Sequence, residues 1–350
     1  MNLNFASDNV GPAAPEILAA LVEANSASAM PYGKDPFTTR AQDMIRDTFE
    51  APEASVHLIS TGSAANALAL AALANPWDAI FCHHEAHIEV DECGAAQFYS
   101  GGAKLRRVPG ANGKITPDTL GAALAEIPPQ NVHSVQRGPV SLTQLTELGT
   151  AYSRAELSDL TAMAKDAGLK VHLDGARFAN AVAAAGCSPA DMTWRLGVDA
   201  LSFGGTKNGC LGVEAVVFFD PEHAWELSLR RKRAGHLWSK GRFLGAQIAA
   251  YLEDGLWLSL AGAANARMAE LCAGLADLPE AKIVAEPAGN LVFLTLPKPV
   301  HDRAFSAGAA YYSYDTDPEG APDRPVRARI VCDWSKTSAD VAGLLALWRG

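Results

Sequence analysis

The sequence predicts an α/β protein with a large, mainly parallel-sheet domain and a smaller C-terminal α+β domain. Its 350 residues suit two hydrophobic cores better than one. Hydrophobic residues make up 49% of the chain and charged residues 19%, which is typical of a compact folded protein. From residue 56 to residue 219, short apolar runs alternate with helix-like segments, which indicates parallel strands joined by right-handed helical crossovers.

The first strand-to-helix unit is expected at residues 56–74. Residues 56–59 form a short apolar run, and residues 64–74 are rich in Ala and Leu, both good helix formers. The small residues Ser60–Ser63 lie between them and allow a sharp turn. This turn places small polar residues at the start of a helix.

Two later helices are predicted from their caps. Thr116 followed by Pro117 is typical of an N-cap with proline at the first helical position. Ser153 and Glu156 form a capping box, and Gly168 closes the helix that they open.

The rest of the large domain is expected as a strand at 169–173, a helix near 189–196, a strand at 198–203 and a third buried strand of the same kind at 213–219. The first of these strands runs into Asp174, and the second ends in Gly204–Lys207. Ligands of such sheets bind beyond the carboxyl ends of the strands. We therefore expect residues 60–63, 174–177 and 204–207 to meet at one edge of the sheet.

The C-terminal part of the chain has a different pattern. Residues 242–260 show the periodicity of one long helix. Beyond it we expect a helical stretch to Leu278 and strands near 282–284, 291–296 and 327–332. We therefore divide the chain into a large domain of residues 1–245, which includes the N-terminal segment, and a small domain of residues 246–350.

Charge and cysteine content exclude several classes of protein. The net charge of −10 argues against a nucleic-acid or anionic-membrane partner, because Lys and Arg bind phosphate groups. The basic run Arg230–Arg233 fits a solvated helix face, with an anion contact at a subunit boundary as the alternative. The six cysteines lack paired spacing, which indicates reduced thiols and no metal framework. Without a signal peptide or an apolar stretch of about 18 residues, we expect a cytoplasmic protein.

Lys207 and Asp174 are the first candidate catalytic residues. An ordinary lysine amine has a pKa near ~10.4, and desolvation or a cationic neighbour lowers this pKa enough for a Schiff base to form. Alone, Lys207 also fits a surface loop, and Asp174 also fits a helix N-cap. Together, on separate strand ends of one sheet, they fit pyridoxal phosphate (PLP), whose ring nitrogen needs a carboxylate to stay protonated.

Two further segments suit the same cofactor. Gly62, Ser63 and Ala64 open a helix whose first N–H groups are unpaired and attract anions, although a simple helix cap has the same composition. His87 lies in a His-rich stretch followed by Asp91 and Glu92. Such a stretch fits metal binding, a solvated loop, or a histidine that stacks on a flat ring.

Taken together, these motifs make the chain resemble the low-specificity L-threonine aldolases. That family has the aspartate-aminotransferase-like fold of the fold type I PLP enzymes. The segments that carry this resemblance are STGSAAN at 60–66, EAH at 85–87, HLDGARFANA at 172–181 and FGGTKNG at 203–209. They occur in consistent order from about Phe5 to Cys332.

The resemblance implies a role for each site residue. Lys207 would carry PLP as a Schiff base, Asp174 would pair with the ring nitrogen, and His87 would stack on the ring near Glu92. Gly62, Ser63 and the Ala64 amide would hold the phosphate, and Ser7, Arg177 and Arg329 the substrate carboxylate. The resemblance implies no metal. It does imply a homodimer or homotetramer with shared active sites.

This sequence departs from the family pattern at three places. Glu147 stands where many members have a histidine near the substrate β-hydroxyl, Lys34 stands where an acid is usual, and the glycine-rich segment after Arg233 is only partly kept. The first departure bears on stereochemical preference. The third leaves open whether Arg233 or Lys240 of a neighbouring subunit reaches the phosphate.

The activity implied is cleavage of L-threonine, L-allo-threonine and related β-hydroxy-α-amino acids to glycine and an aldehyde. The proton of the β-hydroxyl would go to His87 or to a water held by Glu92. The alternative is another reaction on the same scaffold, such as β-elimination or transamination of a small amino acid.

Overall fold

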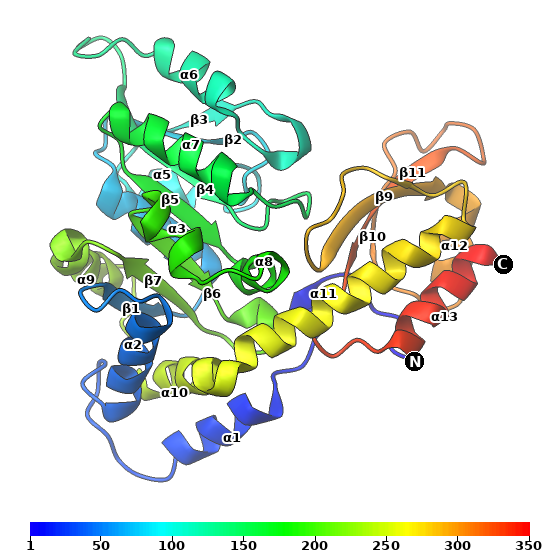
Figure 1. The fold of residues 1–350 in the computed structure, drawn as a ribbon, viewed down its shortest axis with the longest axis horizontal. Helices are drawn as coiled ribbons and strands as arrows, with labels where there is room; N and C mark the ends of the chain where they lie inside the picture. The colour runs from blue at the N-terminus through cyan, green and yellow to red at the C-terminus, as the bar shows by residue number, and fades with distance from the viewer.

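A seven-stranded sheet forms the centre of the larger lobe in the computed structural model, which describes all 350 residues (Figure 1). Its strands are β1 (Ser55–Ile59), β2 (Asp78–His83), β3 (Lys104–Val108), β4 (Gln136–Thr143), β5 (Val171–Gly175), β6 (Ala200–Gly204) and β7 (Glu214–Phe218). Their order across the sheet is β1-β7-β6-β5-β4-β2-β3. The predicted mainly parallel α/β sheet is confirmed.

Strand β7 departs from the prediction, because it runs antiparallel to both of its neighbours, β1 and β6. The buried strand expected at 213–219 is therefore confirmed, but it does not run parallel to the two strands before it. Only residues 205–213 connect β6 to β7. A parallel return needs a crossover of about a dozen residues or more, so the chain has to reverse direction here.

Helices cover both faces of this sheet (Figure 1). They are α1 (Pro15–Ala24), α2 (Pro36–Thr48), α3 (Gly62–Leu73), α4 (His87–Val90), α5 (Ala95–Tyr99), α6 (Pro117–Ala125), α7 (Arg154–Asp166), α8 (Phe178–Ala185), α9 (Ala224–Arg233) and α10 (Arg242–Leu252). The predicted caps are confirmed, since Thr116 and Ser153 are the N-cap residues of α6 and α7 and each forms a capping box. Gly168 adopts the left-handed backbone just after α7 ends.

Two predicted helices are interrupted. The expected helix at 242–260 breaks into α10 and α11 (Leu256–Gly274), because Asp254 and Gly255 have φ values of +48° and +71°. The helix expected near 189–196 is replaced by two short 3₁₀ turns separated by Thr193, whose φ of −131° and ψ of −108° are not helical. In both places the backbone leaves the helical conformation inside the stretch that was expected to be one helix.

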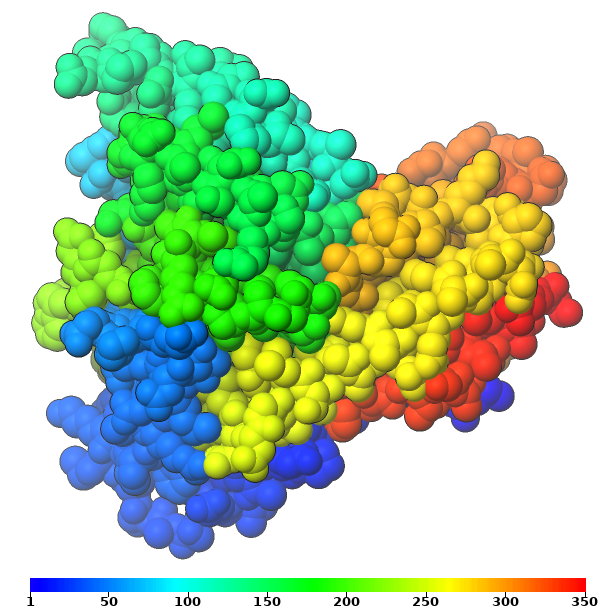
Figure 2. Space-filling view, in the orientation of Figure 1, coloured from blue at the N-terminus to red at the C-terminus, as the bar shows by residue number.

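A four-stranded antiparallel sheet of order β10-β11-β9-β8 builds the smaller lobe. It consists of β8 (Lys282–Ile283), β9 (Leu291–Pro297), β10 (Tyr312–Tyr314) and β11 (Pro325–Val331), accompanied by α12 (Lys298–Ser306) and α13 (Ser338–Arg349). The predicted α+β character is confirmed. In the space-filling view, a notch separates the surfaces of the two lobes (Figure 2).

Helix α11 belongs to both lobes. Its first part, with Trp257 and Leu260, packs in the core of the large sheet, and its second part, with Met268 and Leu271, packs in the core of the small sheet. The domain boundary at residue 245 stays a prediction, with α10 packed in the larger core.

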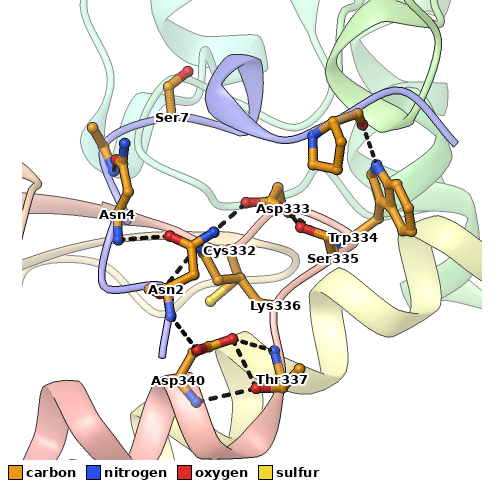
Figure 3. Close-up of polar contacts among 12 residues, drawn as sticks. Asn2, Asn4, Ser7, Cys332, Asp333, Trp334, Ser335, Lys336, Thr337 and Asp340 are labelled. Carbon is orange, nitrogen blue, oxygen red and sulfur yellow. Dashed lines mark hydrogen bonds and ion pairs between the residues drawn. The ribbon is translucent and has the colours of Figure 1, made fainter.

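The first fourteen residues, here called the N-terminal strap, start on the small lobe and reach the large lobe, where Ala14 packs in the larger core and donates to the Gly209 carbonyl oxygen. Phe5 lies in the small lobe's core, and the backbone of the strap pairs with Ala310 and Val331. Figure 3 shows Asn2 bound to Asp340 and Lys336, beside the turn at Asp333. The first residues of the strap are therefore held by the C-terminal lobe, although they begin the chain.

Three other sequence predictions have outcomes in the structure. All six cysteines are free thiols, as predicted. The basic run ends α9 and is only partly a solvated face, because Arg230 and Arg231 donate to the carbonyl oxygens of Tyr99 and Leu58. None of the helices combines the length and the apolar character that a membrane crossing needs.

Candidate active site

Two connected cavities lie between the carboxyl edge of the large sheet and the small lobe. The inner cavity, of 260 Å³, is lined by Ser60, Gly62, Ser63, Asn66, Glu92, Thr143, Asp174, Thr206 and Glu214, among others. The outer cavity, of 990 Å³, is lined by Ser7, Glu85, Asp91, Phe293, Thr295, Tyr312, Tyr314, Arg327 and Arg329, among others. Asn9, His87, Glu147, Arg177 and Lys207 line both cavities.

The three motifs expected at one edge of the sheet do meet there. Residues 60–63 follow β1, residues 174–177 end β5, and residues 204–207 end β6, and each segment contributes to the inner cavity. Strands β5 and β6 are parallel neighbours, with Asp174 opposite Ser202. Lys207 follows three residues after the end of β6, in a short 3₁₀ turn.

Lys207 lies in an environment that suits a nucleophilic amine. Burial and the positive charge of Arg177 lower the pKa of Lys207, against the opposing charges of Asp8 and Asp174. A lowered pKa raises the fraction of unprotonated amine at neutral pH.

Asp174 ends a short chain of buried hydrogen bonds. Asn66 on α3 donates its side-chain amide to Asp174 Oδ2 at 2.8 Å and to Glu92 Oε1 at 2.9 Å. Asp174 Oδ1 accepts the Ala176 N–H at 3.0 Å, so the carboxylate does not cap helix α8. A carboxylate has about four acceptor positions, and Asp174 therefore keeps capacity for another donor in the cavity.

His87 is joined to the same chain through Glu92. His87 Nδ1 lies 2.8 Å from Glu92 Oε1, and this bond raises the pKa of His87. Burial raises the pKa of Glu92. The alternative metal site is not built around His87, because the only clustered ligands are His83, His84 and Glu85.

His83 is itself poorly placed for a metal. Its Nε2 atom contacts the Gly110 carbonyl oxygen at 3.1 Å, and its Nδ1 atom accepts the N–H of Glu85 at 3.2 Å. Both ring nitrogens are therefore already engaged.

Glu147 lies where the two cavities meet. Its Oε1 atom accepts the backbone N–H of His87 at 2.8 Å and the Thr143 hydroxyl at 3.1 Å, while Oε2 is buried without a partner. Burial, reinforced by the charge of Asp174, raises the pKa of Glu147 to about 7. Glu147 therefore changes its protonation state near neutral pH.

The predicted phosphate cradle is present in part. Gly62 and Ser63 begin α3 and line the inner cavity. Ala64 does not line it, and its N–H points to Thr61 Oγ1 at 3.4 Å. The open anion-binding groups of this helix are therefore those of Gly62 and Ser63.

The predicted carboxylate-binding residues come together from three parts of the chain. Ser7 is on the strap, Arg177 follows β5, and Arg329 is on β11, and all three line the outer cavity. Arg177 donates through Nε and Nη2 to Asp8 at 2.7 and 3.0 Å. Arg329 donates to the carbonyl oxygen of Ala6 at 3.0 Å.

Sequence reasoning missed three buried residues of this site: Asn66, Asp8 and Glu214. Glu214 lines the inner cavity and accepts the Gly205 N–H at 3.0 Å, and burial raises its pKa to about 7. Asn66 lay within a motif that the sequence did identify. Asp8, directly after Ser7, is an acid beside a predicted substrate-binding residue and was the most visible signal.

Comparison with solved structures defines the class of protein. A threonine aldolase from Leishmania major superposes with a TM-score of 0.91 at 27% identity, over 99% of each chain. A serine palmitoyltransferase from Sphingomonas wittichii shares the fold alone, with a TM-score of 0.72 at 16% identity over 99% of this chain and 86% of that one. The fold is that of the fold type I PLP enzymes.

Sequence comparison then gives the family. Residues 4–298 match the family of beta-eliminating lyases. The low-specificity L-threonine aldolase of Pseudomonas aeruginosa is 42% identical over 94% of this chain and 92% of its own length. That of a Pseudomonas species is 39% identical over 98% and 96%. The chain is a lyase and belongs to the low-specificity L-threonine aldolase family.

Proposed function

We propose that this protein cleaves the Cα–Cβ bond of L-threonine, L-allo-threonine and related β-hydroxy-α-amino acids, giving glycine and an aldehyde. The observation that carries the proposal is the placement of Lys207 and Asp174 at neighbouring strand ends in one cavity, beside Arg177. The named activity of the Pseudomonas relatives supports it.

The inner cavity fits PLP as the cofactor. A Cβ atom added at Gly62 would meet nothing within 4 Å, so the start of α3 is open to a phosphate. Asn66 Oδ1 and Glu92 Oε2 are buried without hydrogen-bond partners, which is typical of a site that a ligand completes. When bound, PLP withdraws the electron pair of the bond being broken.

In this proposal Lys207 holds the cofactor and Asp174 keeps its ring nitrogen protonated. Gly62 and Ser63 bind the phosphate at the start of α3. His87 would contact the bound ring, and Glu92 fixes the orientation of its imidazole.

Substrate orientation is the task of the outer residues. Arg177, Arg329 and Ser7 bind the α-carboxylate, since the guanidinium group suits a carboxylate. With the carboxylate held there, these residues would orient the Cα–Cβ bond for cleavage by the cofactor.

Proton transfer is assigned to the network around His87. Its Nε2 atom takes the proton of the β-hydroxyl, and Glu92 at Nδ1 stabilises the charged imidazole. Cβ leaves as the aldehyde, and the proton that His87 accepts balances the proton that Cα takes up to give glycine. Glu147, whose Oε2 is buried without a partner between the cavities, would face the β-hydroxyl of a bound substrate.

We further propose that the protein forms a homodimer or homotetramer in the cytoplasm and completes its active sites between subunits. Large apolar side chains support self-association: Trp225 on α9 is 73% exposed and Phe98 on α5 is 77% exposed. The bond from Arg230 to the Tyr99 carbonyl oxygen holds these helices side by side.

The decisive experiment is product analysis with the purified protein and PLP. We expect glycine and acetaldehyde from L-threonine, and comparison of L-threonine, L-allo-threonine and phenylserine will define the substrate range. Release of ammonia and a keto acid instead would identify β-elimination, the reaction named in the matched family. That result would overturn the proposal.

A further inference from the structure

We propose that Asp8 is a positioning residue for substrate binding, because it fixes the guanidinium group of Arg177 in the orientation that meets the substrate carboxylate. The inference rests on the proposed function, in which Arg177 binds that carboxylate. Nothing in the sequence motifs assigns a role to Asp8.

The contact between the two residues is a buried, two-pronged ion pair. Nε and Nη2 of Arg177 donate to the two oxygens of Asp8, at 2.7 and 3.0 Å. The Asp8 side chain is fully buried, whereas that of Arg177 is 12% exposed and lines both cavities. Asp8 lines neither cavity, and so it holds Arg177 from behind while Nη1 remains available to a ligand.

The strap connects this pair to the other lobe. Asn290, just before β9, donates to Asp8 Oδ2 at 3.2 Å and to the Cys332 carbonyl oxygen at 2.9 Å. Two residues before Asp8, the Ala6 carbonyl oxygen accepts a hydrogen bond from Arg329. The short strap segment Ala6–Asp8 therefore contacts both arginines, although one belongs to each lobe.

Nearby positive charges keep the Asp8 carboxyl group ionised. Burial raises the pKa of Asp8, but the positive charges of Arg177 and Lys207 outweigh burial and lower it. A buried carboxylate beside Arg177 could instead compete with the substrate for the guanidinium group. Positioning and competition predict opposite effects on affinity when the charge is removed.

The test compares Asp8→Asn with a matched control, Asp333→Asn. Asp333 is 1% exposed, lies against Gly11 of the strap and pairs with Lys336 at 3.6 Å, but lines neither cavity (Figure 3). Both variants remove one buried carboxylate that contacts the strap. Only Asp8 touches Arg177.

Binding of glycine to the PLP-loaded enzyme gives a readout that does not depend on turnover. We expect Asp8→Asn to raise both the Kd for glycine and the KM for L-threonine by about tenfold or more, with a smaller change in kcat. Asp333→Asn should change neither constant by more than about twofold. The visible absorption of the loaded enzyme should also titrate at lower pH in Asp8→Asn, because a negative charge near Lys207 is lost.

Asp8→Glu provides a second variant if Asp8→Asn folds poorly. Asp8→Glu keeps the negative charge but displaces the carboxylate. The KM for L-threonine should therefore rise, while the pH midpoint of the visible absorption stays near that of the wild type. A lower Kd in Asp8→Asn would show competition and overturn the inference, as would equal effects of Asp8→Asn and Asp333→Asn. The two proposals can fail separately. If the wild type binds glycine more tightly than Asp8→Asn does but does not cleave threonine, the proposed function fails and the inference stands.

Discussion

The inner and outer cavities differ in how their side chains are held. In the inner cavity Asp174, Asn66, Glu92 and His87 form one buried chain of hydrogen bonds. The outer cavity is bounded by one face of the small sheet, where Tyr312 and Tyr314 are largely exposed. Polar groups in a buried network are costly to disturb, whereas exposed side chains adapt. From this difference we expect the bond-breaking chemistry in the inner cavity and substrate preference in the outer one.

The largest effect is expected at Lys207. Lys207→Ala should remove the visible absorption of bound PLP and reduce turnover to below about one thousandth of wild type, because no other amine can replace it. Spectra and kcat, measured beside exposed Lys104→Ala as control, check this. A variant that kept both absorption and turnover would refute the assignment of Lys207.

Asp174→Asn should have the next largest effect. The amide keeps the shape but removes the negative charge that stabilises a protonated ring nitrogen, so we expect kcat for L-threonine to fall by about 100-fold or more. The same loss is expected for phenylserine, since the inner cavity serves every substrate. Steady-state kinetics with both substrates tests this, and a loss confined to one of them would contradict the division between the cavities.

Glu147, at the junction of the cavities, should affect stability as a function of pH. Because its pKa rises to about 7 on folding, the folded state binds its proton more tightly than the unfolded state does. Its ionisation therefore destabilises the protein progressively as pH rises from about 4.5 to about 7. Glu147→Gln should increase Tm, relative to wild type, by a few degrees more at pH 8 than at pH 5. A difference in Tm that is independent of pH would argue against a buried, titrating Glu147.

The smallest effect on threonine cleavage is expected at Tyr314. Its ring is 43% exposed and lies 6.1 Å from that of Phe293 in the outer cavity. Tyr314→Ala should change kcat/KM for L-threonine less than about twofold but lower that for phenylserine several-fold, because only the larger substituent reaches this wall. An equal loss for both substrates would show that the outer cavity is not where substituents are distinguished.

Local patterns were sufficient for much of the fold. The caps at Thr116 and Ser153 were predicted correctly because a capping box is made within four residues. The antiparallel direction of β7 was not predicted, although the connection at 205–213 is too short for a parallel crossover. The break at Asp254–Gly255 was also missed, since an apolar helical pattern continues on both sides of it.

The sequence by itself determined the fold class and the family, and it correctly predicted that the motifs with Lys207 and Asp174 meet at one edge of the sheet. Those residues lie in short motifs at strand ends, and the edge of a parallel sheet brings such ends together. Only the tertiary structure decided which side chains hold them: Asn66 meets Asp174 across 108 residues, and Asp8 meets Arg177 across 169. Such pairings follow from packing of the whole chain. The partners of these buried hydrogen bonds lie on elements far apart in the sequence, and no local pattern shows that those elements will meet.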